Sequence, residues 1–385
     1  MAGEFDYGLS TPASNSPVTT YGIDRDRRDI DVSKEIARLI PDANPFLVIL
    51  MRARKRTTKT AEFYWYDSEP GAWWTQADGG VDDSANQIVV DDPTIFRTRD
   101  IIKVPRTGEV MFVTGVDEAT KTVSVVRGYG VTTPAAINDN DWLLRLGNAM
   151  EEFSRAPEPK VAQPVKEYNY TQIFRRPFDQ SMTSEREALK TSETERTRLR
   201  RDQALEHRLD IERALLFGER KEDVTNKRRM TGGLLQFIKT KHYDAGNDLT
   251  EDKFEEFCEM LFQHGSQRKL LVCSYRVGSI INKFARDRID TRSGEETYGI
   301  RLKQYRSFHG DLYIVPSRTL EKEYQGLAFG VDMDYIEYRP LNGRDTTLRT
   351  NIQLPDEDGW RDEYITEVGL SVRLEKVHAV LHNAA

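Results

Sequence analysis

The sequence contains few of the residues on which enzymes and metalloproteins most often depend. Only two cysteines occur among 385 residues, Cys258 in a predicted helix and Cys273 in a predicted strand. These positions indicate buried thiols rather than a disulfide. The six histidines are scattered, and His378 and His382 would lie about 13 Å apart on one strand, too far to chelate one metal ion. We therefore expect no metal site.

Catalytic and nucleotide-binding motifs are also missing from the sequence. It contains no H-E-x-x-H, paired C-x-x-C, G-x-S-x-G, Walker or dinucleotide-binding pattern. No set of residues assembles a nucleophile, a base and an oxyanion site. We therefore expect a protein that is not an enzyme and that has no catalytic residue and no cofactor.

Long apolar runs and a strong positive charge are lacking too. No segment is apolar enough to span a bilayer, and the first twenty residues lack the order of a signal peptide. The net charge of -7 argues against a protein whose whole surface binds nucleic acid. With 38% hydrophobic residues the chain has enough apolar surface for two or three domains. We expect a soluble protein that is assembled in a cytoplasm.

Four short segments allow two interpretations each. The glycine-rich segments 127–130 and 231–233 suit turns better than phosphate loops, since neither lies between a strand and a helix start. The acidic segment 356–360 suits a solvated loop better than a cation site. The basic residues Arg52, Arg54, Lys55 and Arg56 either contact phosphate or pair with acidic residues across a subunit contact, and we favour the second.

Residues 76–150 have the pattern of a small all-β unit. "DIIKV", "EVMFVTGV", "TVSVVRG" and "DWLLRLGN" predict short strands separated by turns, which suggests a barrel or a sandwich. Aromatic strands flank this unit, one around Glu62 to Asp67 and one within Glu167 to Asp179. A proline-rich linker precedes the second of them.

A long charged helix is predicted from Ser184 to Phe217, with Ser184 and Glu187 as a capping box and Gly218 as a left-handed cap. It carries eight acidic and eight basic residues. Only its C-terminal half has an apolar face, through Ile211, Leu215 and their neighbours. We expect that half to lie on a core and the charged half to be exposed or to face a neighbouring subunit.

The rest of the chain predicts an α/β region. An amphipathic helix at 251–262 ends before Gly265, and "KLLVCS", "VGSIINKFAR", "DLYIVPS" and "GLAFGV" follow as strand, helix, strand and strand. From 367 onward apolar and polar residues alternate, which predicts one long, half-buried terminal strand. The first forty-odd residues, with "DRDRRD" at 24–29, predict an arm that becomes ordered against another surface, with a short helix at 31–40.

This order of parts resembles the tailed-phage major capsid proteins of the HK97 fold. The segment "DPTIFRTRDIIKV...GEVMFVTGVDEATKTVSVVRGYG...GNA", followed by "EYNYTQIFRRPFDQS", is more narrowly similar to the SU10-type major head proteins. The resemblance covers nearly the whole chain. It implies an α+β, HK97-like capsid fold with a small all-β insertion domain in an extended hairpin called the E-loop.

The resemblance also implies a division into parts. The N-terminal arm would cover 1–43, the start of the peripheral domain with the first E-loop strand 44–75, the insertion domain 76–150, and the linker with the return strand 151–180. The peripheral domain would continue over 181–230, with a spine helix at 184–217. The axial domain would cover 231–334, the peripheral sheet 335–375, and a strand returning to the axial domain 376–385.

The function implied is that of a head subunit that forms hexamers and pentamers of an icosahedral shell around double-stranded DNA. Its location would be the virion capsid, assembled in the host cytoplasm. Partners would be other copies of the chain, portal and scaffolding proteins, decoration proteins in some cases, and DNA through weak, salt-sensitive contact. The alternatives are an encapsulin-like compartment subunit, or a carbohydrate-binding module or enzyme built on the β insertion, for which a convergent polar pocket would be the distinguishing feature.

Charged and aromatic residues of the arm, the hairpin and the spine helix are the candidates for inter-subunit contacts. The aromatic candidates have an alternative role as a local hairpin core. The set is Arg25, Arg27, Arg28, Arg52, Arg54, Lys55, Arg56, Trp65, Trp73, Trp74, Tyr168, Tyr170, Phe174, Arg175, Arg176, Glu193, Arg196, Arg198 and Arg201, and Phe63, Tyr64 and Tyr66 are further aromatic candidates.

Overall fold

The computed structural model describes residues 45–155, 163–187, 194–284, 289–290 and 303–384. The described residues form two compact units. One contains Glu62–Asn169 together with Ser371–Glu375, and the other contains the remainder. The short helix predicted at 31–40 and the arm before it lie outside the described residues.

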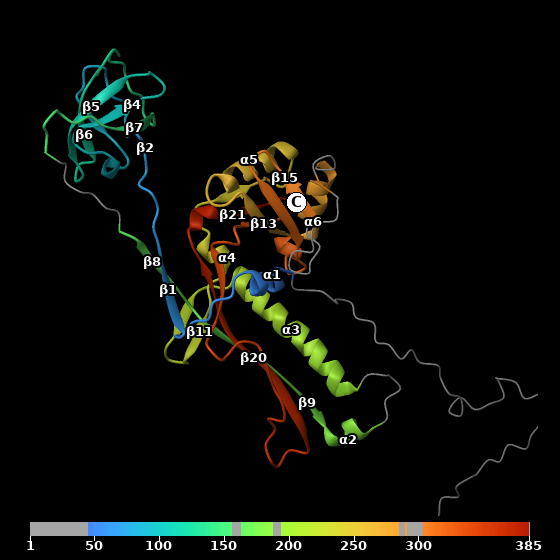
Figure 1. Cartoon of the computed structure of the whole chain (residues 1–385). Helices are drawn as coiled ribbons and strands as arrows, with labels where there is room; N and C mark the ends of the chain where they lie inside the picture. The colour runs from blue at the N-terminus through green and yellow to red at the C-terminus, as the bar shows by residue number, and fades with distance from the viewer. Residues whose placement is uncertain (1–44, 156–162, 188–193, 285–288, 291–302, 385) are drawn as a thin grey trace, which may run out of the picture. The chain divides into compact units, whose positions relative to one another are not determined.

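The first unit contains a closed six-stranded barrel, drawn in cyan and teal in Figure 1. The strands pair in the order β2-β7-β4-β5-β6-β3, and an antiparallel bridge from Ala77 to Val90 joins β3 back to β2. Register shifts within β5 and between β4 and β7 mark the irregularities that help a small sheet to curve. Their bounds are β2 Trp74–Gln76, β3 Gln87–Val89, β4 Asp100–Lys103, β5 Val110–Asp117, β6 Thr122–Val126 and β7 Trp142–Asn148.

Apolar side chains from strands β3 to β7 fill the barrel. Ile88, Ile102, Met111, Val123 and Leu143 are completely buried, as alternate inward-facing positions require. A short 3-10 helix, η2 (Pro93–Ile95), covers one end and is capped by Asp92. The strands expected from the four β-rich segments are confirmed.

A two-stranded ladder belongs to the same unit. It pairs β1 (Glu62–Asp67) with β8 (Val165–Tyr170). Along β1 the side chains alternate, so that Phe63 and Trp65 are buried whereas Tyr64 and Tyr66 are exposed. One face of this hairpin is therefore a packed layer, and the other presents tyrosines to solvent.

The second unit is centred on a seven-stranded mixed sheet with the order β12-β21-β17-β13-β16-β15-β14. The bounds are β12 His242–Asp244, β13 Arg268–Cys273, β14 Ile289–Asp290, β15 Lys303–Arg306, β16 Asp311–Pro316, β17 Ala328–Val331 and β21 Ala379–His382. Strand β13 runs parallel to β16 and antiparallel to β17, and five of its six residues are buried. Four of these five, Leu270 to Cys273, form the continuous apolar run that is typical of a central strand covered on both faces.

Helices cover this sheet. Helices α5 (Glu251–Phe262) and α6 (Tyr275–Phe284) pack on one face, where Phe254, Phe257 and Val277 join its main core cluster. Gly265, which follows α5, has φ +87, so it ends the helix in a conformation that other residues rarely adopt. Lys269 donates to the carbonyl oxygens of Leu261, His264 and Val377 and satisfies free groups at this helix end.

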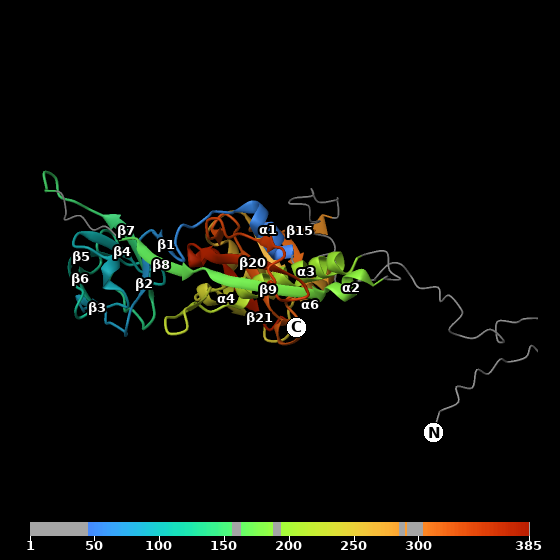
Figure 2. The ribbon, with the colours of Figure 1, turned by 90° about the horizontal axis from the view of Figure 1, so that it is seen from below.

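A four-stranded sheet is built around β20 (Gly359–Val372), the longest strand. Strand β9 (Gln172–Ser181) pairs antiparallel with it over ten positions, from Gly359 opposite Ser181 to Val368 opposite Gln172. Strands β18 (Ile336–Pro340) and β19 (Thr347–Arg349) complete the sheet. Helix α3 (Glu195–Phe217) lies along β9 in both views (Figures 1 and 2).

The prediction of one helix over 184–217 was wrong in its first part. Met182–Arg186 form a separate short helix, α2, capped by Ser181 rather than Ser184. Glu187 and Thr194 both have extended backbone angles, so α3 starts only at Glu195. The first part of the predicted helix had no apolar face, and tertiary packing supplies most helix stability in proteins.

The role predicted for Gly218 was wrong as well. Its φ is -61, which is not left-handed. A side chain there would collide with the carbonyl oxygens of Ala214 and Thr231. Glycine therefore permits a close approach of two backbones at the end of α3.

The prediction of one half-buried terminal strand was also wrong. Residues 366–372 are buried at every position, and β20 ends at Val372. Leu374 has φ +48, and the 3-10 helix η4 (Glu375–Val377) then leads into β21. The alternating pattern failed because both faces of this part of β20 are covered.

Shorter elements complete the second unit. Helices α1 (Pro45–Ala53) and α4 (Leu234–Phe237) lie against α3, the hairpin β10–β11 (Lys221–Asp223 and Arg228–Met230) follows α3, and η3 covers Lys322–Tyr324. Within the described part of the chain, no helix has the length and apolar character needed to cross a membrane.

Candidate assembly surfaces

Asp362 of β20 holds the charged half of α3 against the four-stranded sheet of the same chain. This carboxylate is fully buried and accepts hydrogen bonds from Arg196 (2.9 and 3.2 Å), Arg200 (2.8 and 3.0 Å) and the Asn351 backbone N–H (2.9 Å). The Arg196 guanidinium also lies 4.1 Å from the ring centre of Trp360. Burial would raise the pKa of Asp362, but these hydrogen bonds outweigh it and the pKa is lowered.

Strand β9 makes a second set of ion pairs with the same helix and sheet. Arg176 donates to Gln203 at 2.9 Å and to Asp210 at 2.8 Å, both on α3, and it also pairs with Glu206. Arg175, which points to the other face of the strand, pairs with Glu363 at 2.6 Å. The expectation that the charged half of α3 is exposed or faces a neighbour was therefore wrong for the residues that meet β9 and β20.

A buried carboxylate on α3 holds the start of α1. Glu212 is fully buried and accepts hydrogen bonds from the Leu47 backbone N–H (3.1 Å), Ser317 Oγ (2.9 Å) and Thr319 Oγ1 (3.0 Å). Burial raises the pKa of this carboxyl group despite these hydrogen bonds. Glu212 thus satisfies a free N–H at the first turn of α1, the helix that directly follows the N-terminal segment.

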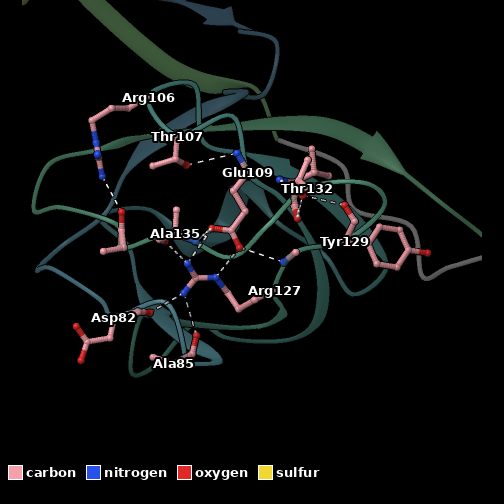
Figure 3. A network of polar contacts seen from close by, with 12 residues as sticks. Asp82, Ala85, Arg106, Thr107, Glu109, Arg127, Tyr129, Thr132 and Ala135 are labelled. Carbon is pink, nitrogen blue, oxygen red and sulfur yellow. Dashed lines mark hydrogen bonds and ion pairs between the residues drawn. The ribbon is translucent and has the colours of Figure 1, made fainter.

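A buried ion pair organises the loops at one end of the barrel (Figure 3). Arg127 donates to both carboxylate oxygens of Glu109 at 2.8 Å and to the carbonyl oxygens of Asp82, Ala85 and Ala135. Burial would raise the pKa of Glu109, but the hydrogen bonds from Arg127 and two backbone N–H groups lower it. Three loops are therefore fixed by one arginine.

Exposed aromatic side chains gather at two places in the barrel unit. On the hairpin, Tyr64 and Tyr66 are 55% and 61% exposed and meet edge to face at 6.0 Å, with Lys166 lying 4.4 Å above the Tyr64 ring. On the barrel, Trp73, Trp74 and Trp142 are all about half exposed, and Trp74 meets Trp142 edge to face at 6.4 Å. Exposed aromatic groups of this size are typical of binding surfaces.

The basic residues after α1 have acidic partners within the chain. Arg54 pairs with Asp334 at 2.6 Å, Lys55 pairs with Asp345, and Arg56 lies 3.9 Å from Glu337. Parallel bridges from Lys55 to Tyr338 and from Thr58 to Leu341 place this segment beside β18.

The other predicted contact residues differ in their surroundings. Trp65 and Phe174 are buried, Tyr168 and Tyr170 are partly buried, and Arg198 pairs with Glu195 and Asp202 on its own helix. Arg52 and Arg201 are exposed at the helix surface. Arg25, Arg27, Arg28 and Glu193 lie outside the described residues. Contact between subunits stays a prediction for the whole set.

Three buried carboxylates, Glu109, Glu212 and Asp362, were missed by sequence reasoning. Each looks like a solvated residue in the sequence, because the side chains that donate to it are 18 to 166 positions away. The one sequence signal that indicated burial was the position of Glu212 on the same helix face as Ile211, Leu215 and Leu216.

The described residues contain no cluster of three or more histidine, cysteine or acidic side chains that could hold a metal ion. Two histidines do meet, since His242 Nδ1 lies 2.6 Å from His382 Nε2. His242 Nε2 faces the Ile238 carbonyl oxygen at 2.8 Å, so that nitrogen donates and Nδ1 accepts from His382. The pair is therefore explained by a hydrogen bond.

Comparison with known proteins assigns the family. The family model of the SU10 major capsid protein matches residues 10–385. A major capsid protein of Pseudomonas phage PaMx41 is 23% identical over 244 residues, which cover 59% of this chain and 58% of that relative. The match thus spans less than two thirds of the relative's length.

Solved structures resemble the chain over almost its whole length. The capsid of an empty GTA particle matches with a TM-score of 0.51 and 12% identity, covering 97% of this chain and all of that one. The capsid of the Cyanophage P-SCSP1u matches with a TM-score of 0.51 and 9% identity, covering 96% and 99%. These likenesses show a mixed α/β fold shared with HK97-like phage capsid proteins. Together with the match over residues 10–385, they show that the chain belongs to the SU10 major capsid protein family.

Proposed function

We propose that this chain is the head subunit that self-assembles into hexamers and pentamers of an icosahedral shell enclosing double-stranded DNA. The observation that carries the proposal is the family match from residue 10 to the last residue. A protein of this kind acts by forming contacts with copies of itself, so we propose no catalytic role.

In this proposal each part of an HK97-like subunit would correspond to an element of the fold. The β1–β8 ladder and the following β9 would be the E-loop, and the six-stranded barrel would be its insertion domain. Helix α3 would be the spine helix of the peripheral domain, beside the β20 sheet. The seven-stranded sheet with α5 and α6 would be the axial domain, and residues 1–43 would be the N-terminal arm.

The exposed face of the hairpin is the best supported contact surface. Tyr64 and Tyr66 expose large apolar rings to solvent. The buried side chains of Phe63 and Trp65 on the opposite face hold the backbone of β1 in place. Rigid aromatic side chains of this kind are frequent anchors at protein interfaces. We propose that this face packs on a second copy of the chain.

The hydrogen bond from the Leu47 N–H to Glu212 supports a role for the N-terminal arm in contacts between subunits. Glu212 fixes the first turn of α1, the first described element of the chain, through the Leu47 backbone N–H. The basic residues Arg25, Arg27 and Arg28 would then reach a neighbouring subunit. Individual ion pairs on such surfaces contribute about 0 to 1 kcal/mol, which allows contacts to form and re-form during assembly.

Contact with DNA would be weak, since the chain has a net charge of -7. Portal and scaffolding proteins, and decoration proteins on the outer surface, are further proposed partners. Assembly would take place in the host cytoplasm.

Electron microscopy of the purified full chain tests the proposal. We expect closed icosahedral particles of uniform size, or free hexamers and pentamers, and we expect nuclease-protected DNA in particles from infected cells. A chain that stays monomeric at high concentration with its scaffolding partner present would contradict it. Particles that protect an enzyme cargo instead of DNA would point to an encapsulin-like compartment.

A further inference from the structure

A depression on the barrel lies outside the proposed E-loop contact face. Its volume is about 750 Å³, within the range of small-molecule sites in proteins. Three segments line it: the loop before β2 with Trp73, the η2 turn with Asp92, Thr94 and Arg97, and β7 with Arg145 and Leu146. All of them belong to the barrel unit.

The apolar part of the depression is the indole ring of Trp73. Trp73 is 63% exposed, and Leu146 beside it is 53% exposed. The carbonyl oxygen of Trp73 accepts a hydrogen bond from the Arg145 backbone N–H at 2.9 Å, which holds the residue against β7. An exposed aromatic ring on a held backbone offers a flat surface to an equally flat apolar partner.

The polar part supplies donors and an acceptor side by side. Arg145 is held by the buried carboxylate of Asp100, with 2.6 Å between Nε and Oδ2. Asp92 caps η2 through Oδ1, which accepts from the Thr94 N–H (2.9 Å) and hydroxyl (2.6 Å). Its other oxygen, Oδ2, accepts no hydrogen bond from any described residue. A fixed guanidinium and an available carboxylate oxygen therefore border the indole ring.

This combination selects one class of ligand. A pyranose ring has one face of C–H groups and a rim of hydroxyls, each of which both donates and accepts hydrogen bonds. The C–H face can stack on the Trp73 ring. Neighbouring hydroxyls can donate a hydrogen bond to Asp92 and accept one from Arg145. Small barrels also bind oligosaccharides in other proteins.

Charge argues against a phosphate ligand. Residues 76–150 contain eleven acidic and seven basic residues. The charge of Arg145 is already balanced by Asp100, and Asp92 would repel a phosphate. A single strand of nucleic acid would need a basic groove beside the aromatic ring. A neutral ligand is favoured.

We propose that this depression of the barrel binds a neutral carbohydrate, with a pyranose ring stacked on Trp73 and its hydroxyls bonded to Asp92 and Arg145. The barrel would thereby give the chain a glycan-binding function in addition to shell formation.

The test is a titration of the purified full chain with maltose, lactose, mannobiose and N,N′-diacetylchitobiose, followed by saturation-transfer NMR of the sugar and by tryptophan fluorescence. We expect saturable binding of at least one disaccharide. Trp73→Ala should weaken it at least tenfold, whereas Trp73→Phe should retain most of it. Asp92→Asn, which can still cap η2, should weaken it severalfold.

Trp142→Ala is the matched control, because Trp142 is equally exposed on β7 but does not line the depression. It should leave the affinity unchanged. Three results would overturn the proposal: no disaccharide binds saturably, Trp142→Ala and Trp73→Ala weaken binding equally, or oligo-dT binds more tightly than every sugar. Unchanged melting of each variant shows that the barrel remains folded.

Discussion

The substitution Asp362→Asn tests whether contacts within the chain, from the four-stranded sheet around β20, hold the charged half of α3. Asparagine keeps the shape and one acceptor oxygen, so the Asn351 N–H and one Arg196 nitrogen still find a partner. The other oxygen becomes an NH₂ group that faces the N–H groups of Arg196 and Arg200. The charge that balances two arginines is lost at the same time.

The magnitude follows from the burial of the three groups. Breaking a fully buried ion pair costs about 3 to 5 kcal/mol, and a single hydrogen bond to a charged group contributes about 1.5 to 3 kcal/mol. Arg196 and Arg200 keep 24% and 34% of their side-chain exposure, so water compensates part of the loss. We expect a cost of about 3 kcal/mol, which corresponds to a roughly 100-fold change in an equilibrium constant.

Hydrogen exchange followed by mass spectrometry on the full chain measures this cost locally. Peptides from 195–206 should exchange about 100-fold faster in the variant, and peptides from α5 should be unchanged. Asp202→Asn is the matched control on the same helix. Its partially exposed pair with Arg198 is worth about 0.3 to 0.5 kcal/mol, or about a twofold change. Equal effects of the two substitutions would refute the reasoning.

The same network predicts a pH dependence. Because the pKa of Asp362 in the folded chain lies below its usual value of 3.8, its stabilising effect is fully present above that pH. It is lost as the pH falls through the lower, folded-state pKa. The difference in exchange between wild type and Asp362→Asn should therefore be constant from pH 5 to 8 and should shrink below pH 3.8.

Three further predictions concern the other sites. Glu212→Gln should loosen α1 by about 2 kcal/mol at neutral pH, measured by exchange of its amides. Because burial raises the pKa of Glu212 above 4.5, its contribution to stability falls as the pH rises through the folded-state value, and the variant, which cannot titrate, should lack this dependence. Arg127→Met should destabilise the barrel by about 3 to 5 kcal/mol, measured by hydrogen exchange of the β6 amides. Arg106→Met, at an exposed ion pair, should lower the stability of the barrel by less than about 1 kcal/mol. The double substitution of Tyr64 and Tyr66 by serine should abolish closed particles in electron microscopy without changing the melting of the chain, and normal particles would exclude the hairpin face as a contact.

Local patterns were sufficient for the strands of the barrel unit, though not to decide between a barrel and a sandwich, and for much of the α/β region. At the start of "TVSVVRG" valine alternates with threonine and serine, and Val123 and Val125 are the buried positions of β6. The amphipathic spacing of Phe254, Phe257, Cys258 and Leu261 likewise predicted α5 and the face on which it packs. In these elements one face is buried and the other is exposed, so the spacing of apolar residues predicts both the type of element and its buried face.

The pattern failed where burial depends on distant partners. Asp362 is buried because Arg196 and Arg200, more than 160 positions earlier, neutralise it. The start of α3 was misplaced because Ser184 and Glu187 imitate a capping box, whereas Ser181 caps the separate helix α2 and α3 begins after Thr194, which makes no side-chain cap. No local signal reveals a carboxylate whose donors lie on another strand or helix.

The central claim is that copies of this chain bind one another through the hairpin face, and mixed-isotope cross-linking tests it most directly. Particles are assembled from equal parts of unlabelled and ¹⁵N-labelled chain and treated with an amine-reactive cross-linker that reaches Lys166, which lies above Tyr64. We predict that about half of the Lys166 cross-links to another copy join a light and a heavy peptide, as random mixing of two equal pools requires. Cross-links of Lys166 that join only peptides of the same isotope would contradict the account.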